Sequence, residues 1–263
     1  MSVEEQFCQC VVRHAACVLA GIKPAALFNF IPRRPEECAG CTCERLCDAQ
    51  VRRQAGLQAL GFTRRYGTRG VRCDVLTVGR GRALMLVSRT AGLAGLIGQA
   101  DVAAFLAQAG LDVAGPRQLV RSLRIKMAGF EGCRTAQTAA KPDGNESERP
   151  ANGARTPHTV GGNHVGDDSG TDVQEAPRCA RCPRACSEES PAFPHEVGVV
   201  LGYPLSDVRA FIAHDGKDEL ACGVWKAYSD PQGAQACWQA MRACRAQALH
   251  RYRQGAALEE LIA

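Results

Sequence analysis

The chain lacks the motifs that identify several common enzyme classes. It has no Gly-Lys-Ser/Thr phosphate loop and no Gly-x-Ser-x-Gly nucleophile elbow, and Gly79-x-Gly81 is without the third glycine of a dinucleotide-binding motif. His195-Glu196 is not followed by a second histidine, which excludes the His-Glu-x-x-His motif of zinc proteases. No catalytic activity therefore follows from a standard motif.

The chain also lacks long apolar runs and a concentrated charge. Its best apolar stretch, 91–109, is interrupted by Gln99, Asp101 and Gln108 and falls short of the continuous run typical of a membrane span. The polar, acidic start at Met1 has none of the positive charge of a signal peptide. The net charge is +5, with basic residues spread along the chain. We expect a cytoplasmic protein with no membrane partner and no nucleic-acid partner.

Cysteine, by contrast, is abundant, with 15 residues in a chain of 263. Seven of them form two clusters, at Cys38, Cys41, Cys43 and Cys47 and at Cys179, Cys182 and Cys186. Each cluster contains a Cys-x-x-Cys step, which lets two thiolates bind one ion from a tight turn. In a reducing compartment such spacing predicts metal ligands rather than disulfides. Zinc and an iron–sulfur cluster are both compatible with it; thiol redox chemistry and unligated thiols are the alternatives.

The region 131–178 loses apolar periodicity and is rich in Gly, Pro, Asn, Asp and Thr. Such a composition cannot bury enough apolar surface to offset the entropy of chain ordering, so it predicts a disordered insert. We expect residues 1–130 and 179–263 to form the two parts of a single domain.

Hydrophobic periodicity in these two parts alternates between helical and extended patterns. Helices are expected over 7–19, over 44–60 with Gly61 as a stop, over 90–110, over 117–127, from Pro194, from Ser206 as an N-cap, and from Pro231. Strands are expected over 27–31 and 224–228, and 71–77 and 83–88 form a predicted hairpin around Gly79-Arg80-Gly81. The pattern predicts an α/β or mixed α+β fold, with a small mixed sheet of about four strands covered by helices.

Four segments occur together in an order that resembles a known family: 14–28, 82–89, Gly223-Val224-Trp225-Lys226-Ala227-Tyr228, and, most specific, Phe193-Pro194-His195-Glu196-Val197-Gly198-Val199-Val200-Leu201-Gly202-Tyr203-Pro204. They resemble the bacterial family catalogued as domain of unknown function 3793. The resemblance implies a link to iron or redox metabolism, with a flavodoxin-like or iron-metabolism protein as the expected partner.

Six polar side chains inside these family-like segments are candidates for a shared ligand or partner surface: Lys23, His195, Glu196, Tyr203, Lys226 and Tyr228. A neutral imidazole near a helix start can act as a base or a ligand, and either lysine can meet an anion at the end of a turn or strand. The alternatives are structural: Glu196 caps its helix, His195 bonds to a loop, and the lysine stems pack on the sheet.

Three functions follow as hypotheses. The first is an accessory or binding protein of metal or redox metabolism that holds zinc or an iron–sulfur centre. The second is an enzyme acting on a small anionic substrate, in which His195 or Glu196 is the acid or base and Lys23 or Lys226 holds the anion. The third is a partner-binding module without a cofactor, which predicts an exposed apolar patch.

Overall fold

The computed structural model describes residues 2–32, 44–139 and 193–263. Residues Met1–Glu131 and Ala192–Ala263 form one compact unit, and Gly132–Pro191 form a second. The elements below belong to the first unit, except that α5 (Pro116–Ala139) continues past Glu131. The combination of many helices with two small sheets confirms the predicted α+β class.

The main sheet has three antiparallel strands in the order β1-β3-β2: β1 (Ala25–Phe30), β3 (Arg82–Arg89) and β2 (Val71–Gly79). β2 and β3 form the predicted hairpin. Its two turn residues both have positive φ, 55° at Arg80 and 72° at Gly81, as a tight two-residue hairpin requires. The Gly81 N–H donates to Asp48 Oδ1 at 2.7 Å, which ties the turn to the start of α2.

One face of this sheet is covered by α1 (Val3–Leu19) and α2 (Glu44–Tyr66). Alternate strand residues such as Phe28, Met85 and Val87 point to this side and are buried with apolar residues of both helices. A capping box starts α1, because the Glu5 N–H donates to Ser2 Oγ and the Ser2 N–H donates to the Glu5 carboxylate.

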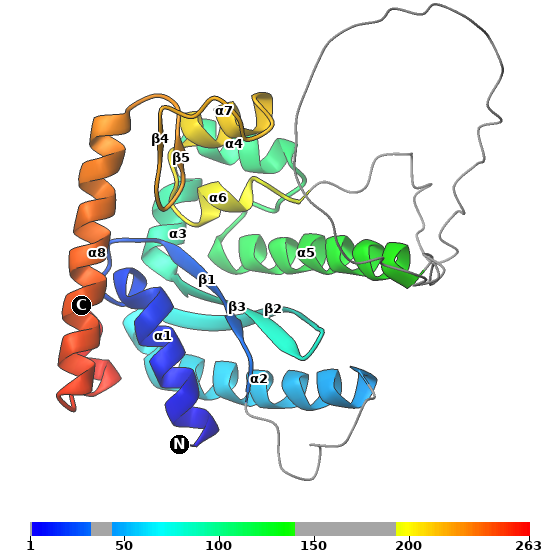
Figure 1. Ribbon diagram of the computed structural model, residues 1–263, viewed down its shortest axis with the longest axis vertical. Coiled ribbons are helices and arrows are strands. Elements are labelled where there is room, and N and C mark those ends of the chain that lie inside the picture. The colour runs from blue at the N-terminus through cyan, green and yellow to red at the C-terminus, as the bar shows by residue number, and fades with distance from the viewer. Residues whose placement is uncertain (1, 33–43, 140–192) are drawn as a thin grey trace, which may run out of the picture. The chain divides into compact units, whose positions relative to one another are not determined.

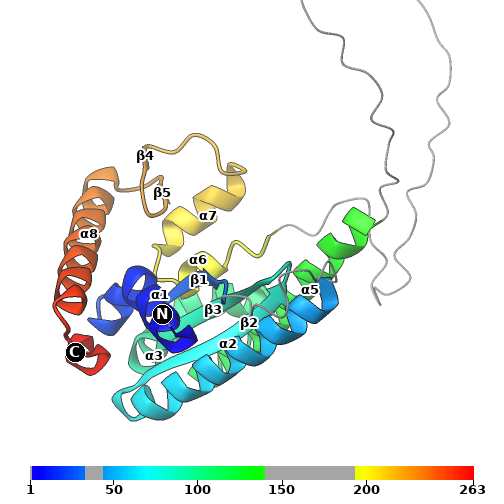
Figure 2. The ribbon, with the colours of Figure 1, turned by 60° about the horizontal axis from the view of Figure 1, so that its bottom comes forward.

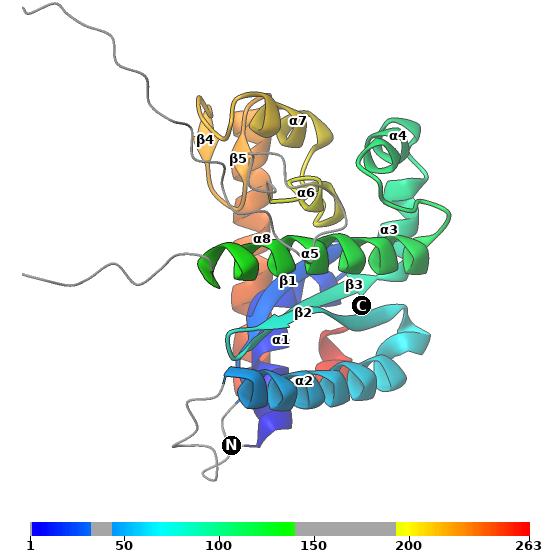
Figure 3. The same cartoon turned by 90° about the vertical axis from the view of Figure 1, so that its right-hand side faces the viewer.

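The other face is covered by α5, with α3 (Thr90–Ile97), α4 (Ala100–Gln108) and α6 (Val197–Val200) extending the same core. Leu86 of β3, Leu119 and Leu123 of α5 and Val200 of α6 are fully buried in it. Figure 3 shows α2 and α5 on opposite sides of the sheet. The core of this unit is therefore assembled from segments on both sides of the region 140–192.

The C-terminal part adds α7 (Leu205–Ala213), a short hairpin of β4 (Ala221–Cys222) and β5 (Lys226–Ala227), α8 (Pro231–Arg253) and η3 (Leu258–Leu261). Helix α8 packs along α1 (Figures 1 and 2). A third small core, with Trp225 and Trp238 at its centre, joins the hairpin to α8.

Several predicted details are corrected by the structure. The main sheet is purely antiparallel rather than mixed, and the strand expected near 224–228 pairs only in the separate β4–β5 hairpin. Helix α2 passes through Gly61 to Tyr66, because Phe62 and Tyr66 continue its buried face. The helix expected over 90–110 is two helices, α3 and α4, bent by 90°.

The boundaries in the C-terminal part also differ. Pro204, not Ser206, lies at the N-cap of α7, and α6 begins at Val197, beyond Pro194. Helix α5 ends at Ala139, so the start of the predicted insert is helical, and positions 140–178 lie outside the described residues.

Among the described residues, no single helix has both the length and the hydropathy of a membrane span. The bent pair α3–α4 passes that test only when its two helices are taken together.

Candidate functional site

An apolar pocket of about 380 Å³ lies between α6, α7 and the β4–β5 hairpin. Its volume falls at the small end of the range typical of ligand sites. The lining is mainly apolar and aromatic, with a few polar side chains at its edge. The lining residues are Leu27, Phe193, His195, Val197, Gly198, Leu201, Tyr203, Asp207, Val208, Phe211, Cys222, Gly223, Val224, Trp225 and Lys226.

Two glycines hold the α6 wall close to its neighbours. A Cβ at Gly198 would lie 3.1 Å from the side chains of Tyr203 and Val208, so glycine lets α6 pack closely on α7 without displacing them. Gly202 has a φ of +83°, and an added Cβ would lie 2.6 Å from the Pro24 ring. These contacts explain why a four-residue helix can form one wall of the pocket.

Asp207 organises the opposite wall from the first turn of α7. Its side chain is buried, with an exposed fraction of 3%, and it accepts four hydrogen bonds. Oδ2 accepts from Trp225 Nε1 at 2.8 Å, and Oδ1 accepts from the Tyr228 N–H at 3.0 Å and from the N–H and hydroxyl of Ser229 at 3.1 and 2.9 Å. Burial by itself would raise the pKa of the Asp207 carboxyl, but these hydrogen bonds hold the pKa below its ordinary value. The carboxylate thus anchors the β4–β5 hairpin to α7.

Aromatic stacking sets the position of Trp225. Its ring stacks on Tyr203 with 5.3 Å between centroids and meets the edge of Trp238 at 5.4 Å. Gly223 makes room for Trp238, because an added Cβ would lie 2.4 Å from that ring. The tryptophan that lines the pocket is therefore held on two sides and by its indole N–H.

Three of the six predicted surface residues, His195, Tyr203 and Lys226, come together at this pocket. The His195 ring lies 4.9 Å from that of Phe211 and 5.7 Å from that of Phe193. Lys226 Nζ donates to the Gly216 carbonyl at 2.6 Å and pairs with Glu219 at 3.1 Å, and the hydrogen bond to Glu219 raises its pKa. The His195 imidazole and the Tyr203 hydroxyl form no hydrogen bond to another described residue, whereas the Lys226 ammonium is occupied.

The other three predicted residues lie elsewhere. Glu196 is buried next to the pocket wall and pairs with Lys126 of α5, whose Nζ also donates to the Ala109 carbonyl at 2.6 Å. Its carboxylate makes no capping bond to α6. Lys23 lines a different, smaller cavity of about 160 Å³ with Cys17 and His14, and its ammonium lies 5.1 Å from the centre of the Tyr203 ring.

Tyr228 stacks on His214 with 5.7 Å between ring centroids, outside the lining of the pocket. Its hydroxyl is buried and has no hydrogen-bond partner among the described residues.

The predicted metal ligands fall almost entirely outside the described residues. This holds for Cys38, Cys41, Cys43, Cys179, Cys182 and Cys186, and Cys47 is described only as part of the α2 backbone. Within residues 2–32, 44–139 and 193–263, no three His, Cys, Asp or Glu side chains are grouped to hold a metal ion. Metal binding by the two clusters stays a prediction.

Sequence reasoning missed Asp207, Phe211 and the wall position of Trp225. Asp207 follows Pro204 in the first helical turn, a common place for acidic residues, and nothing local distinguishes it from an exposed one. The one local signal for Trp225 was its place in the Gly223–Tyr228 segment. Only the packing of the hairpin on α7 shows that this segment and 193–204 line one pocket.

Comparison with known proteins gives one match. No curated protein and no solved structure is significantly similar to the chain. A family model described as "Protein of unknown function (DUF3793)" matches residues 179–262, a segment that begins at Cys179 and includes every lining residue of the pocket except Leu27. The resemblance found in the sequence is thereby confirmed for residues 179–262, which match the model of the family of domain of unknown function 3793.

Proposed function

We propose that this protein is a binding protein whose apolar pocket takes a small molecule with a flat, ring-bearing apolar group and one polar substituent. The observation that supports this most is the lining itself. Four aromatic side chains, Phe193, Tyr203, Phe211 and Trp225, border a cavity of about 380 Å³. Aromatic faces and edges favour a ring between them, and burial of apolar ligand surface supplies the free energy of binding.

The polar substituent would meet His195, whose imidazole lies between Phe193 and Phe211 at the pocket edge. Lys226 is a weaker candidate for this contact, because Glu219 and the Gly216 carbonyl already occupy its ammonium. Polar groups without protein partners in an apolar pocket orient a ligand.

Catalysis on an anionic substrate is less well supported. The hypothesis needs an acid or base and a free cation in one enclosed space. Glu196 is buried against Lys126, Lys23 lines another cavity, and Lys226 is paired with Glu219. His195 therefore stands without the partners that an acid–base site needs, and we favour binding.

The test is a ligand-observed NMR screen of monocyclic and bicyclic aromatic carboxylates, amines and phenols against the full chain, followed by titration of tryptophan fluorescence. Trp225 borders the pocket, so a bound ring should change its emission. Phe211→Ala removes one wall, and we expect it to weaken binding of a hit by about tenfold to hundredfold, since a lost aromatic contact with its buried area is worth about 1.5–3 kcal/mol.

The matched control is Leu220→Ala, a truncation of an exposed apolar residue that is not part of the lining. Hits that lose affinity equally in both variants, or a screen without hits, would contradict the proposal. A hit that binds wild type and is displaced by a purified flavodoxin would instead favour the partner-binding module, with an apolar side chain of the partner in the pocket.

Metal binding by the cysteine clusters is a second proposed function, supported by the Cys-x-x-Cys spacing in both clusters. Its test is the metal content and absorbance spectrum of untagged protein purified without oxygen, for wild type and for Cys41→Ser/Cys182→Ser. Loss of zinc or iron in the variant is the expected result, and unchanged metal content would overturn this proposal.

A further inference from the structure

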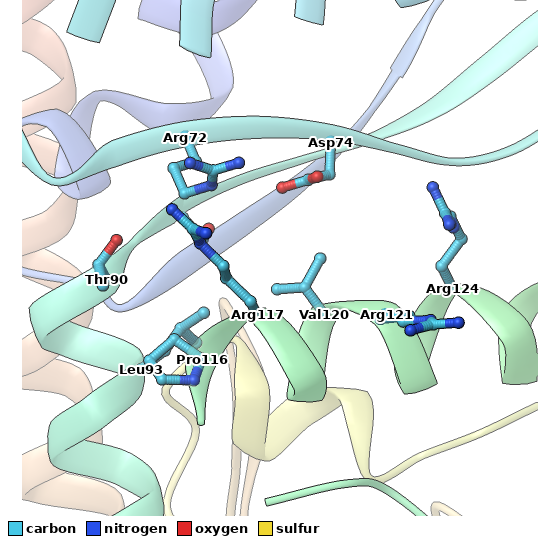
Figure 4. Close-up of a pocket in the computed structure, with 10 residues that line it drawn as sticks. Arg72, Asp74, Thr90, Leu93, Pro116, Arg117, Val120, Arg121 and Arg124 are labelled. Carbon is cyan, nitrogen blue, oxygen red and sulfur yellow. The ribbon is translucent and has the colours of Figure 1, made fainter. Parts of the chain in front are cut away.

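A second cavity, of about 200 Å³, lies between β2 and α5 and differs from the first in its chemistry. Its lining consists of Arg72, Asp74, Ser88, Thr90, Leu93, Pro116, Arg117, Val120, Arg121 and Arg124, which we refer to as the arginine cleft. It shares no lining residue with the apolar pocket. In Figure 4, Arg72 and Arg117 extend toward each other from β2 and α5, and Asp74 points into the same space.

The strand residues of the cleft are polar, although they lie on the sheet face that α5 covers. In β2, Val71 and Cys73 face the α1–α2 side and are buried there, so the alternating residues Arg72 and Asp74 face α5. Ser88, opposite Arg72 in the β2–β3 register, has an exposed fraction of 2% and also faces the cleft. Polar residues on the covered face of a sheet oppose core formation unless they have a function.

The helix residues of the cleft lie on one face of α5. Arg117, Arg121 and Arg124 are spaced i, i+4 and i+7, which places the three residues on the same face of the helix. The cleft also lies at the N-terminal end of this long helix, beginning at Pro116, where the helix dipole favours an anion.

The charge of the cleft is not balanced by the protein. Four arginines and one aspartate line it, a sum of +4 − 1 = +3. Arg72, Arg117, Arg121 and Arg124 form no ion pair and no side-chain hydrogen bond within the described part of the chain. Elsewhere in that part, Arg65 and Arg89 bond to a carboxylate or to carbonyl oxygens, whereas exposed arginines such as Arg52 and Arg53 have no such partner. Arg117, Arg121 and Arg124 are also exposed, so what distinguishes the cleft is the grouping of four arginines around one cavity. Burial raises the pKa of the Asp74 carboxyl, whereas the neighbouring Arg72 and Arg124 lower it.

We propose that the arginine cleft binds a small phosphate-bearing anion. Guanidinium groups match phosphate oxygens with paired N–H donors, and the hydroxyls of Ser88 and Thr90 are additional donors at the cleft wall. The cavity of about 200 Å³ equals roughly seven water molecules at about 30 Å³ each, which suits a group the size of pyrophosphate. This inference is independent of the apolar pocket and of its ligand.

The test is isothermal titration of the full chain with pyrophosphate and with inorganic phosphate, at an ionic strength held constant with sodium chloride. Arg117→Gln/Arg121→Gln should weaken pyrophosphate binding by about tenfold or more for each guanidinium that contacts the anion. Asp74→Asn should strengthen binding, because it removes the one carboxylate of the cleft. A merely structural role for these side chains would not produce changes of opposite sign.

The matched control is Arg52→Gln/Arg53→Gln, which removes the same charge from positions of α2 that are exposed, as Arg117 and Arg121 are, but do not line the cleft. Pyrophosphate binding that is lost in the cleft variant and kept in this control supports the proposal. Equal weakening in both, or no binding by wild type beyond that of chloride, overturns it. A single-stranded oligonucleotide that binds more tightly than pyrophosphate and displaces it would also overturn the small-anion assignment.

Discussion

The two cavities of this protein differ in whether their charged side chains have partners within the protein. In the apolar pocket Asp207 has four hydrogen-bond donors and Lys226 has Glu219, so these groups hold the walls in place. In the arginine cleft four arginines and a single aspartate line one cavity, and the four guanidiniums bond to no described residue. Charged groups that already have partners act as scaffold, whereas like-charged groups gathered at one cavity without partners are available to a ligand of opposite charge.

The largest effect should come from breaking the scaffold at Asp207. Asp207→Ala leaves the Trp225 indole N–H and the N–H groups of Tyr228 and Ser229 without their acceptor, and we expect a loss of about 3 kcal/mol in the free energy of unfolding. Urea unfolding followed by circular dichroism measures it. Asp218→Asn is the control, because this exposed acid of the same region has a φ of 61° that asparagine tolerates, and it should change the stability by less than about 0.5 kcal/mol.

A smaller loss of stability is expected from a substitution in the β4–β5 hairpin where it approaches α8. In Gly223→Ala the new methyl group would lie 2.4 Å from the Trp238 ring, and overpacking of this kind costs about 1–3 kcal/mol. Gly56→Ala, in the middle of α2 with nothing within 4 Å of the new Cβ, should instead stabilise by about 0.5–1 kcal/mol. Thermal unfolding of both variants distinguishes the two sites, and a loss of stability in both would show that the contact at Gly223 is not the cause.

The structural role of Asp207 also predicts that the stability of the protein falls at acid pH. Because the folded pKa is lowered, its contribution is fully present above the unfolded value of about 3.9 and is lost as the pH falls through the lower folded pKa. Wild type should lose stability below about pH 4 more steeply than Asp207→Asn. Parallel pH profiles of the two proteins would show that other carboxyls cause the acid loss.

The smallest effect should come from the arginine cleft in the absence of ligand. Arg121→Gln removes one like charge from a crowded set and breaks no ion pair with a described residue, so the melting temperature should stay the same or rise slightly. A clear fall in melting temperature without added anion would mean that the Arg121 guanidinium stabilises the fold. The charged groups of the cleft would then have the same structural role as Asp207 in the apolar pocket.

Local patterns predicted most elements but not their sheet partners. The hairpin around Arg80-Gly81, the helix after Pro231 and the α+β class follow from turn chemistry and periodicity. The end of α2 could not be predicted, since Gly61 is a stop signal that Phe62 and Tyr66 override by burial against the sheet. The expectation that 224–228 joins the main sheet was wrong for a similar reason. Trp225 is buried against Trp238 in the third small core, away from the main sheet.

The two sites were predictable to different degrees. The segments 193–204 and 223–228 were recognisable as family-like, and they supply most of the apolar pocket. Which of their polar residues face it was not predictable, and Glu196 and Tyr228 turned out to face other neighbours. The arginine cleft had no signal in the sequence, because its charged residues are spread over 72–124 and look evenly distributed along the chain.

The sequence by itself determined most of the elements, the family resemblance of residues 179–262 and the glycines and aromatics from which a pocket can be built. Only the tertiary structure decided that α5 faces the polar side of β2 and that the Asp207 carboxylate accepts a hydrogen bond from the Trp225 indole. The physical reason is that propensity and periodicity act between residues a few positions apart, whereas burial and charge neutralisation depend on neighbours brought together by the fold.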